Sequence, residues 1–308
     1  MNMAEQTRLL RGQLREHEPM SRHTSWRAGG TADRAYAPAD IDDLREFLAS
    51  LPVSEPVLFV GLGSNLLVRD GGLRATVILT HAVLNQVRVD GAFVDAQAGV
   101  QSPKVARASA LHGLKGCEFM AGIPGTVGGA LAMNAGCHGA ETWDVVASVT
   151  TIDRAGQLRQ RTRSDYAIGY RSVVPTSGTE EWFVAARFAL AAGDAAESRA
   201  TMKAMLQRRI ETQPLSQPNA GSVFRNPKGD YAARLIEACG LKGFTLGGAE
   251  ISAKHANFIV NTGNASAADI ETLVETAHSA VHQKFGIDLE REVRVVGEPA
   301  HRDRSGSA

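Results

Sequence analysis

The sequence predicts an α+β fold with more than one domain, for three reasons. The chain has 308 residues, which is long for a single hydrophobic core. Short apolar stretches of strand length alternate with short helical patterns and glycine turns over roughly the first two-thirds. Near Ala195 the pattern changes to well-formed helices. We therefore expect a first region over residues 1–195 with two lobes that divide near residues 75–85, a smaller domain over 196–298, and a tail over 299–308.

The first region is predicted to contain short strands and two helices. A helix over 40–51 follows Pro38 and carries apolar residues at helical spacing on one face. A second helix over 102–112 ends at Gly113, a residue that favours helix termination. Strands are expected over 57–60, 76–80, 93–97, 146–152 and 182–190.

The second region is predicted to contain three helices. The first, over 196–212, is rich in strong helix formers and ends before Pro214. In the last, over 266–285, Ser266 and Asp269 resemble a capping box, and apolar residues recur along one stripe. The middle helix covers 230–239, with Gly240 at its C′ position, and strand-like segments are expected over 220–226, 257–261 and 292–296.

Composition excludes several classes of protein. Lys+Arg and Asp+Glu both count 33, which argues against nucleic acid or an anionic membrane as the main partner. No apolar run approaches the ~20 residues of a membrane span, and the polar N-terminus does not resemble a signal peptide. Three cysteines, far apart, indicate a reducing compartment, and no histidine has metal-ligand spacing.

Residues 122–136, which we call the glycine segment, are the most informative stretch. Five glycines and Pro124 are separated by small apolar residues, whereas a flexible linker would be polar. Because an ordinary helix or strand loses stability at each glycine, we expect a rigid, mostly buried loop that a ligand approaches closely. A flat cofactor with a pyrophosphate needs such a loop. The alternative is a loop packed tightly for stability alone.

A second glycine-rich stretch, Gly61-Leu-Gly-Ser-Asn65, follows a predicted strand. It does not fit the dinucleotide fingerprint of Rossmann folds, because Leu66 stands where the third glycine belongs and a turn follows instead of a helix. Backbone N–H groups, the Ser64 hydroxyl and the Asn65 amide would instead surround a phosphate. A structural turn is the alternative. Two such segments suit a dinucleotide that is held at two places.

Other polar segments are ambiguous by themselves. Residues 221–227, which we call the serine segment, place Ser222, Arg225 and Asn226 together, with period-two alternation and two core residues between them. No G-x-S-x-G elbow is present, so a hydrolase nucleophile is not indicated. Glu290, Glu292 and Arg294 share a face in the last strand, and a solvated ion-pair ladder is the alternative.

Taken in order, eight segments resemble the UDP-N-acetylenolpyruvoylglucosamine reductase family (UDP-N-acetylmuramate dehydrogenase, MurB). Each segment is weak evidence alone, but eight in the same order, over nearly the whole chain, are specific. The segments are His23-Thr-Ser-Trp-Arg-Ala-Gly-Gly30, Gly61-Leu-Gly-Ser-Asn-Leu-Leu67, the glycine segment, Gly169-Tyr-Arg171, Ala220-Gly-Ser-Val-Phe-Arg-Asn-Pro227, Leu241-Lys-Gly243 with Gly247-Gly248, Lys254-His-Ala-Asn-Phe-Ile-Val260 and Leu289-Glu-Arg-Glu-Val-Arg294.

The resemblance implies a two-part FAD-binding module of the vanillyl-alcohol-oxidase (PCMH) type over residues 1–195, followed by an α+β domain that binds a UDP-sugar. It implies a flavoprotein oxidoreductase that takes hydride from NADPH through FAD and reduces UDP-N-acetylglucosamine enolpyruvate to UDP-N-acetylmuramate. The reaction belongs to peptidoglycan synthesis in the cytoplasm, and so to cell-wall biogenesis, cell shape and cell division. The chain is expected to be a monomer.

The resemblance also assigns site residues. By position in the motifs, Ser222 matches the proton donor, and Arg171 and Glu292 match the groups that contact and polarise the substrate carboxylate. The expected cofactor-binding residues are Gly61, Gly63, Ser64, Asn65, Leu66, Gly122, Ile123, Pro124, Gly125, Thr126, Gly128 and Gly129. The expected substrate-binding residues are Tyr170, Gly221, Arg225, Asn226, Lys254 and His255, and no metal is expected.

Two features place the chain within the family. The serine segment passes directly through Lys228-Gly-Asp230 into a predicted helix, which resembles the subgroup that lacks an extra loop with a substrate-clamping tyrosine. Arg225 stands where the family commonly has lysine, so the charge is kept while the geometry of its contacts changes.

Two other functions stay open. One is a flavin-dependent sugar or alcohol oxidase on the same module, for which Cys137 or His138 would attach the flavin covalently. The other is a non-catalytic protein that binds a nucleotide sugar. Oxygen uptake with a sugar would favour the first, and a colourless purified protein would favour the second.

Overall fold

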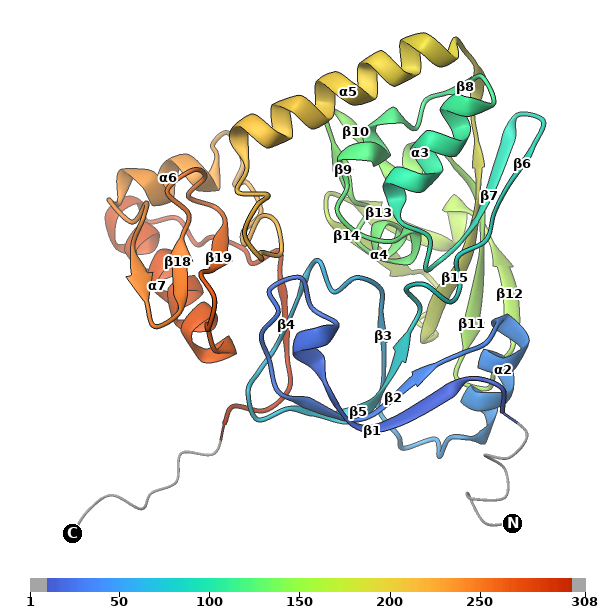
Figure 1. Cartoon of the computed structure of the whole chain (residues 1–308), viewed down its shortest axis with the longest axis horizontal. Helices are drawn as coiled ribbons and strands as arrows, with labels where there is room; N and C mark the ends of the chain where they lie inside the picture. Colours follow the sequence, from blue (N-terminus) through green and yellow to red (C-terminus); the bar gives the residue numbers. More distant parts are fainter. Residues whose placement is uncertain (1–9, 301–308) are drawn as a thin grey trace. The chain divides into compact units, whose positions relative to one another are not determined.

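The computed structural model describes residues 10–300, which form two compact units (Figure 1). Unit 1 contains Ala35–Leu62, Thr76–Arg209 and the residues up to Arg15. Unit 2 contains Glu16–Arg34, Gly63–Ala75 and the residues from Ile210 onward. Each unit is therefore assembled from separate stretches of the chain. Three of the five boundaries between them fall inside strands, which are β1 (Gln13–Pro19), β2 (Thr31–Ala37) and β5 (Leu73–Leu79). The other two fall after Leu62 and after Arg209.

Unit 1 is built on a five-stranded antiparallel sheet of order β12-β11-β15-β7-β6. β7 matches the predicted strand over 93–97, and β11 and β15 match the strands predicted over 146–152 and 182–190 to within a residue at either end. The outer strands β6 and β12 were not predicted, because their outward residues are exposed and polar. The bounds are β6 Val87–Asp90, β7 Phe93–Gln97, β11 Val146–Asp153, β12 Leu158–Arg161 and β15 Glu181–Ala189.

Two helices pack on this sheet and enclose the main core of unit 1 (Figure 1). α3 (Ser102–Leu111) confirms the predicted helix, with His112 as its C-cap. α4 (Val127–Ala132) lies inside the glycine segment, so the prediction of a loop throughout that segment is wrong. A Cβ on Gly128 would lie 3.0 Å from the Ala98 Cβ, so this glycine lets the helix approach its neighbour closely and offsets the low helix propensity of glycine. The expectation that the segment is mostly buried is confirmed.

A second core in unit 1 joins α2 (Ile41–Ser50) to β3 (Val57–Val60), which pairs in parallel with β5. Both elements were predicted. The Asp40 carboxylate accepts a hydrogen bond from Asp43 N at 2.9 Å and caps the helix. The Tyr36 ring stacks on Phe47 with centroids 3.7 Å apart. This core holds the strand that leads into Gly61.

The remaining elements of unit 1 are short, apart from α5. They are β8 (Leu114–Lys115), η2 (Glu118–Gly122), β9 (Gly136–Cys137), β10 (Ala140–Glu141), η3 (Thr142–Asp144), η4 (Arg163–Asp165), the hairpin β13 (Tyr166–Gly169) and β14 (Ser172–Pro175), β16 (Ala191–Ala192) and α5 (Ala195–Thr212). α5 confirms the helix predicted over 196–212, and the chain passes into unit 2 after its residue Arg209.

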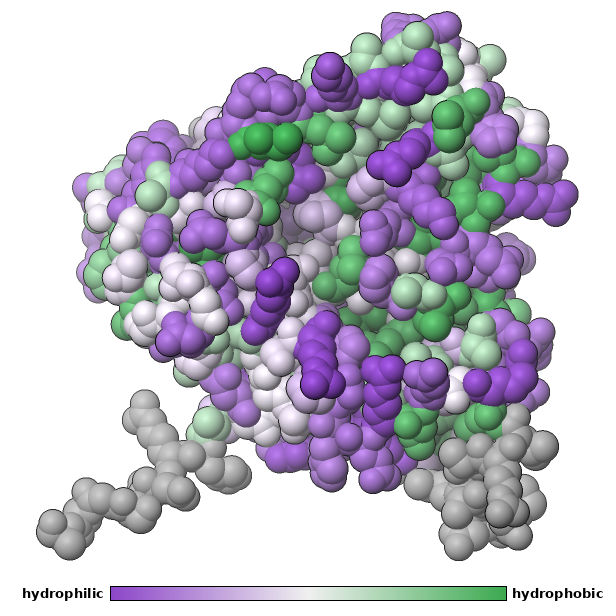
Figure 2. Space-filling view, viewed as in Figure 1, coloured by the Kyte–Doolittle hydropathy of each residue, from purple (hydrophilic) through white to green (hydrophobic). Residues whose placement is uncertain are grey.

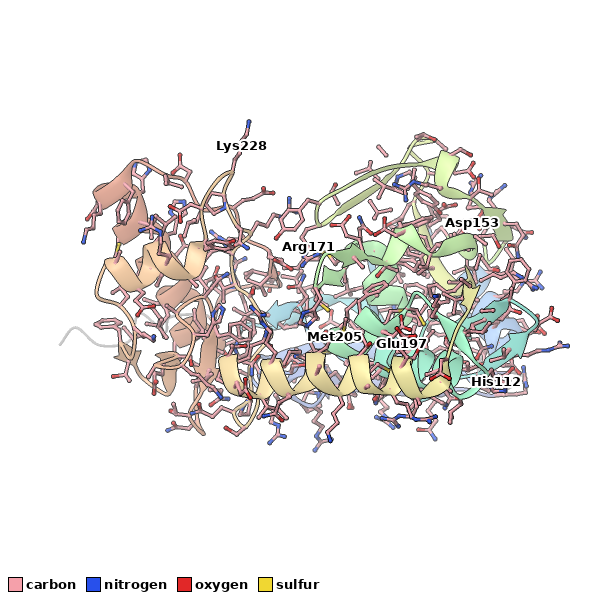
Figure 3. The ribbon with its side chains drawn as sticks, turned by 90° about the horizontal axis from the view of Figure 1, so that it is seen from above. His112, Asp153, Arg171, Glu197, Met205 and Lys228 are labelled. Carbon is pink, nitrogen blue, oxygen red and sulfur yellow. The ribbon has the colours of Figure 1, made fainter. Side chains whose placement is uncertain are left out.

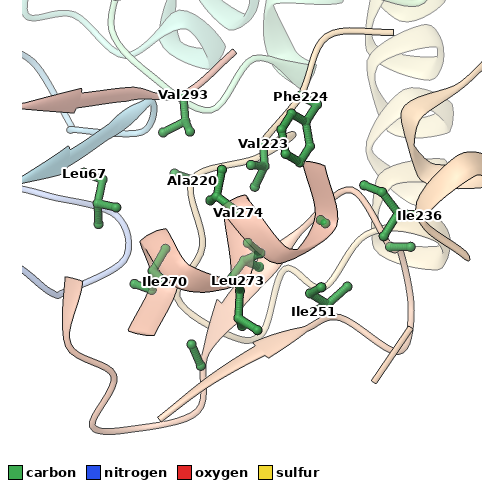
Figure 4. Close-up of a cluster of buried hydrophobic side chains, with 14 of the residues drawn as sticks. Leu67, Ala220, Val223, Phe224, Ile236, Ile251, Ile270, Leu273, Val274 and Val293 are labelled. Atoms are coloured by element: carbon green, nitrogen blue, oxygen red, sulfur yellow. The ribbon is translucent and has the colours of Figure 1, made fainter. Parts of the chain in front are cut away.

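Unit 2 packs two helices and two small sheets around one core (Figure 4). The antiparallel sheet has the order β17-β18-β19, and β4 pairs in parallel with β20. The capping box predicted at α7 is confirmed, because the Ser266 hydroxyl and the Asp269 carboxylate each accept from the other's backbone N–H. The bounds are η1 Met20–Arg22, β4 Leu66–Val68, α6 Ala232–Ala238, β17 Thr245–Leu246, β18 Ala249–Ile251, β19 Ile259–Asn261, α7 Ala267–Phe285 and β20 Arg294–Val296.

The strand-like segment predicted over 220–226 is not a strand. An isolated bridge joins Phe224 to Arg291, and Gly221 has a φ of +74°, which is outside the strand region. Side-chain and loop groups take the backbone hydrogen bonds that a neighbouring strand would provide. β20 starts at Arg294, two residues later than predicted, because Glu292 pairs with the irregular segment around Val223 and not with a strand.

The surface is mixed in polarity. Hydrophilic residues dominate the face in Figure 2, and hydrophobic residues are interspersed among them. Within residues 10–300, no helix combines the length and the apolar character needed to cross a membrane.

Candidate functional site

Close backbone approach joins Gly61 to the glycine segment in unit 1. A Cβ on Gly61 would lie 2.3 Å from the Thr126 Oγ1, a distance that real Cβ atoms do not adopt. A Cβ on Gly122 would lie 2.7 Å from the Cys137 Sγ. Gly61 and Thr126 were both predicted to bind the cofactor, and the structure brings them into contact. Glycine is therefore required at position 61 on steric grounds.

Two polar side-chain atoms lie unpaired beside these glycine-rich stretches. Ser102 Oγ is fully buried and has no hydrogen-bond partner among residues 10–300, while the Ser102 backbone N donates to Gly125 O at 3.0 Å. His81 Nδ1 is also buried and unpartnered within the described chain. His81 follows Thr80 in the chain. The Thr80 N donates to the O of Val60 at 3.0 Å, and Val60 directly precedes Gly61. Buried polar atoms normally have partners, so an ordered water or a group of a bound ligand would satisfy each one.

These observations fit a dinucleotide cofactor. A Cβ on the exposed Gly129 would meet no atom nearer than 3.9 Å, so a phosphate can approach the backbone there, and the Ser102 hydroxyl and His81 Nδ1 can make further hydrogen bonds. Pro124 and Gly129 are exposed while Ile123, Gly125 and Thr126 are buried, so the segment has one open side. Ser102 and His81 were not predicted from the sequence, because a single serine or histidine carries no motif.

Arg171 lies at the turn of the β13–β14 hairpin in unit 1 (Figure 3). Its φ is +54°, a left-handed conformation that is uncommon outside glycine. Its guanidinium donates to Gly136 O at 3.0 Å and to Asn134 O at 3.4 Å, so it is anchored to the end of the glycine segment. The guanidinium carbon lies 4.9 Å from the centre of the Tyr170 ring, which is 48% exposed. The structure therefore joins two predicted site residues to the glycine segment.

Gly63, Ser64, Asn65 and Leu66 belong to unit 2. Leu66 begins β4 and pairs with Arg294 of β20. The Asn65 amide donates to Glu292 O at 3.0 Å, and Arg294 N donates to Asn65 O at 3.1 Å. A predicted cofactor residue and a predicted catalytic residue thus lie on adjacent, hydrogen-bonded segments.

The serine segment lies beside Glu292 in the same unit. Glu292 N donates to Val223 O at 2.8 Å, and Arg225 N donates to Glu290 O at 2.9 Å. Val223 and Phe224 are each 1% exposed, as the sequence predicted for core residues. Ser222 is half-buried, and its hydroxyl makes no hydrogen bond to any residue that the structure describes. The structure therefore brings Ser222 and Glu292, two of the three predicted catalytic residues, onto neighbouring segments.

The predicted substrate residues next to Ser222 have structural contacts of their own. The Arg225 guanidinium lies 2.7 Å from a carboxylate oxygen of Glu290. The Asn226 side-chain oxygen accepts from Ala232 N, the first residue of α6, at 3.1 Å. Gly221 is in the left-handed region, where a side chain would be strained.

A cavity of about 310 Å³ lies in unit 2 beside Lys254. The Lys254 ammonium donates to Ile210 O near the end of α5. The neighbouring His255 is half-buried, and burial is the main cause that lowers the pKa of its imidazole. The cavity is lined by residues 213–217 and by Ile210, Glu250, Ser252, Ala253 and Lys254.

Covalent attachment of a flavin is not favoured at Cys137. Its thiol is half-buried and donates to Phe119 O at 3.1 Å. Burial raises the pKa of the Cys137 thiol, so the reactive thiolate is disfavoured. His138 is exposed and has a left-handed φ of +53°. The structure describes no group of three or more His, Cys, Asp or Glu residues within residues 10–300 that would hold a metal ion.

Two protein-family models match the chain. A model for an FAD binding domain matches residues 32–161, and a model for the C-terminal domain of UDP-N-acetylenolpyruvoylglucosamine reductase matches residues 213–296. The expected order of an FAD-binding module and a following substrate domain is therefore confirmed. FAD as the cofactor is confirmed in the same way.

Curated relatives and one solved structure agree over nearly the full length. UDP-N-acetylenolpyruvoylglucosamine reductase of Thiobacillus denitrificans is 54% identical over 94% of this chain and 94% of its own. The protein of the same name from Nitrosomonas eutropha is 56% identical over 95% of this chain and 91% of its own. The crystal structure of UDP-N-acetylenolpyruvylglucosamine reductase from Thermus caldophilus is 31% identical, with a TM-score of 0.79, and covers 93% of this chain and 99% of its own.

Proposed function

The chain belongs to the UDP-N-acetylenolpyruvoylglucosamine reductase family, and from this premise we propose that it reduces the enolpyruvyl ether of UDP-N-acetylglucosamine to the lactyl ether of UDP-N-acetylmuramate. The hydride donor in this proposal is NADPH, and the reaction serves peptidoglycan precursor synthesis. The observation that carries the proposal is the hydrogen bond from Glu292 N to Val223 O at 2.8 Å, which holds Glu292 beside the residue that follows Ser222.

The reaction adds one hydride and one proton across the enolpyruvyl double bond. When bound, FAD supplies the hydride that it has received from NADPH. Gly61 and the glycine segment would hold the cofactor, and Ser64, Asn65 and Leu66 are further candidate cofactor residues. Ser102 and His81 would add hydrogen bonds through the two buried atoms that lack partners among the described residues.

Ser222 is the proton donor in this proposal. Hydride addition at the β-carbon moves the π-electron pair onto the α-carbon, next to the carboxylate, and gives an enolate. The Ser222 O–H transfers its proton to the α-carbon, and water then restores the hydroxyl. Serine is a weak acid, but an enolate is a strong base at the moment of transfer. The half-buried hydroxyl, which makes no hydrogen bond to the described residues, is available for this role.

Arg171 and Glu292 act on the substrate carboxylate in this proposal. A guanidinium offers several N–H donors in a plane, which suits the charge that develops on the enolate. Arg171 is held in a fixed position by Gly136 O and by the Tyr170 ring beneath it. Glu292 is held through its backbone, so its side chain is presented from an ordered segment.

Substrate recognition is assigned to unit 2. Gly221, Arg225, Asn226, Lys254 and His255 lie there, and the cavity beside Lys254 would take part of the nucleotide sugar. Tyr170 is a further proposed substrate contact. The boundaries at residues 195 and 298, the monomeric state and the cytoplasmic location stay part of the proposal. Analytical ultracentrifugation and cell fractionation test the last two.

Stopped-flow spectroscopy of the two half-reactions tests the proposal. NADPH should bleach the flavin band, and the enolpyruvyl nucleotide sugar should restore it in the absence of oxygen. Ser222→Ala should leave flavin reduction unchanged and slow reoxidation by about 10²–10⁴-fold, the contribution typical of general acid catalysis. A normal reoxidation rate in Ser222→Ala would remove Ser222 from the mechanism. Oxygen uptake with a sugar, in place of anaerobic reoxidation, would indicate the oxidase.

A further inference from the structure

We propose that Asn257 is a positioning residue for Ser222. Its side-chain amide holds the serine segment in the place of a missing neighbouring strand, and so fixes where the Ser222 hydroxyl lies. This inference rests on the proposed function, because it assumes that Ser222 donates the proton.

The amide of Asn257 makes two hydrogen bonds to one residue of the serine segment. Oδ1 accepts from Phe224 N at 3.0 Å, and Nδ2 donates to Phe224 O at 2.8 Å. Asn257 O also accepts from Val223 N at 2.9 Å. Asn257 is 3% exposed, so these bonds are shielded from water. An amide is the side chain that pairs with both groups of one peptide residue at once, as a strand does.

The opposite edge of the serine segment is also fixed. Val223 O accepts from Glu292 N at 2.8 Å, and Arg225 N donates to Glu290 O at 2.9 Å. The side chains of Val223 and Phe224 are buried in the core of unit 2 (Figure 4). Residues 223–225 are therefore held on both edges, with Asn257 on one and residues 290–292 on the other.

Ser222 depends on this arrangement because its own side chain does not fix it. Gly221 precedes it, with a φ of +74°; the Gly221 N donates to Asn219 Oδ1 at 3.0 Å, and the residue offers no side chain to pack. The Ser222 hydroxyl makes no hydrogen bond to a described residue that would fix it independently. The placement of Ser222 therefore depends on the backbone on either side, and Val223 and Phe224 fix the side that follows it. Proton transfer is sensitive to such placement, since a shift of about 1 Å lowers rates by about 10²-fold.

Asn257→Asp separates positioning from packing. The aspartate has the same shape, keeps the acceptor for Phe224 N, and replaces the donor to Phe224 O with a second oxygen that repels it. If this variant fails to fold, Asn257→Ser replaces it, because serine is smaller and still removes the paired bonds.

Asn261 provides a matched control in the same unit. It is 5% exposed, and its amide also bridges backbone groups. Nδ2 donates to Trp26 O at 2.9 Å, and Oδ1 accepts from Gly263 N at 2.8 Å and from Ala265 N at 3.0 Å. None of these groups belongs to the serine segment. Asn261→Asp should therefore destabilise unit 2 comparably without displacing Ser222.

The experiment compares the FAD-loaded variants in stopped flow at equal flavin content. Asn257→Asp should reduce with NADPH at the wild-type rate and reoxidise about 10–100-fold more slowly with the enolpyruvyl nucleotide sugar. The dissociation constant of that sugar, from the change it causes in the flavin spectrum, should move less than threefold. Asn261→Asp should reoxidise within threefold of wild type, while thermal unfolding shows a similar fall in midpoint for both variants.

A double-mutant cycle with Ser222→Ala decides the interpretation. If Asn257 acts through Ser222, Asn257→Asp adds no further slowing in the Ser222→Ala background. Equal slowing in both backgrounds would overturn the proposal, as would equal slowing by Asn261→Asp. If Asn257→Asp reoxidises at the normal rate while Ser222→Ala is slow, the role of Asn257 is overturned and the proposed function stands. A normal rate in Ser222→Ala itself overturns the proposed function, so the two failures are distinguishable.

Discussion

The glycine segment of unit 1 and the serine segment of unit 2 obtain fixed backbone geometry in opposite ways. In the first, side chains are missing where the chain passes close to a neighbour: Gly128 lies beside Ala98, and Gly61 leaves room for Thr126. In the second, a side chain is present where a strand is missing, as at Asn257 beside Phe224. Missing side chains suit a site where a large cofactor must reach the backbone. The Asn257 amide suits a site where one hydroxyl, that of Ser222, must be held in place.

The largest effect is expected from filling the clearance at Gly61. In Gly61→Val the new side chain overlaps Thr126, so the 61–66 segment or the glycine segment must move. We expect FAD binding to weaken by at least about 10–100-fold, read as the ratio of visible to ultraviolet absorbance after purification. Gly169→Ala is the matched control, because a Cβ there meets nothing within 4 Å. Full flavin content in Gly61→Val would break the comparison.

The second prediction tests whether a side-chain amide, that of Asn134, also stabilises the backbone of unit 1. Asn134, which is 1% exposed, donates to Glu141 at 2.7 Å and to Gly169 O at 3.2 Å, and accepts from Trp143 N at 3.1 Å. Asn134→Ala should lower the free energy of unfolding by about 2–4 kcal/mol, because it leaves buried groups unpaired. Urea unfolding measures this.

Two further variants separate the loss of the Asn134 amide from backbone strain and from the general effect of replacing an asparagine. Asn134 has a φ of +40°, so glycine removes the amide without adding backbone strain and should be less destabilising than alanine. Asn85, whose amide donates to Ala82 O at an exposed turn, should change stability by under about 0.5 kcal/mol when replaced by alanine. A small effect of both Asn134 variants would show that clearance alone organises unit 1.

A smaller effect is expected where an ion pair fixes the stretch that follows β4 in unit 2. Arg69 donates three hydrogen bonds to the carboxylate of Glu271 in α7, at 2.7, 2.9 and 3.2 Å, and one to Gly297 O at 3.2 Å. Arg69→Ala should lower the free energy of unfolding by about 1–2 kcal/mol at pH 7. Arg234→Ala, which breaks an exposed pair with Asp230, should have a clearly smaller effect.

The contribution of Arg69 should depend on pH in a defined direction. The hydrogen bond from Arg69 is the main cause that lowers the pKa of Glu271, so the folded state binds this proton less readily than the unfolded state. The stabilisation is therefore present above about pH 4.3, the ordinary glutamate value, and is lost as the pH falls below it. A wild-type advantage that stays constant down to pH 3 would contradict this account.

The smallest effect concerns His255. Burial lowers the pKa of its imidazole, and Nδ1 accepts from Asn257 N at 3.3 Å, which requires a neutral ring. Below about pH 6.5 the unfolded state takes up a proton that the folded state resists, so stability falls with falling pH. In His255→Gln this decline between pH 7.5 and pH 5 should be less steep in urea unfolding, with no change at pH 7.5.

Local sequence signals predicted the regular elements well and the irregular ones poorly. Asp40, Ser266 and Asp269 lie at helix N-termini and cap them, and a cap depends only on residues close in sequence. The serine segment alternates like a strand, yet its partners lie about 35 and 70 residues away in the sequence, at Asn257 and Glu290–Glu292. Short-range patterns carry no information on such partners.

The candidate site shows the same division. Spacing and order of the motifs made the glycines and Ser222 candidates, because backbone clearance and chemistry restrict the residue types that are possible there. Asn257, Ser102 and His81 became candidates only from the structure, because their burial and hydrogen bonding cannot be read from residue type. A signal was present at Asn257, which stands between Ala256 and Phe258, both buried, at the edge of an apolar strand. α4 was missed because glycine's low helix propensity was taken as decisive.

The discontinuity of unit 2 has a consequence for how the chain is made. Trp26 donates through Nε1 to Ile259 O at 2.7 Å, and β4 pairs with β20, so residues from the start of the chain complete a core that ends near residue 296. During synthesis from the N-terminus, Trp26 and β4 must wait for more than 200 further residues before their partners exist. Unit 1 gathers its last stretch earlier, by Arg209. We expect unit 1 to fold on the ribosome first and unit 2 to close only after residues 294–296 have been made.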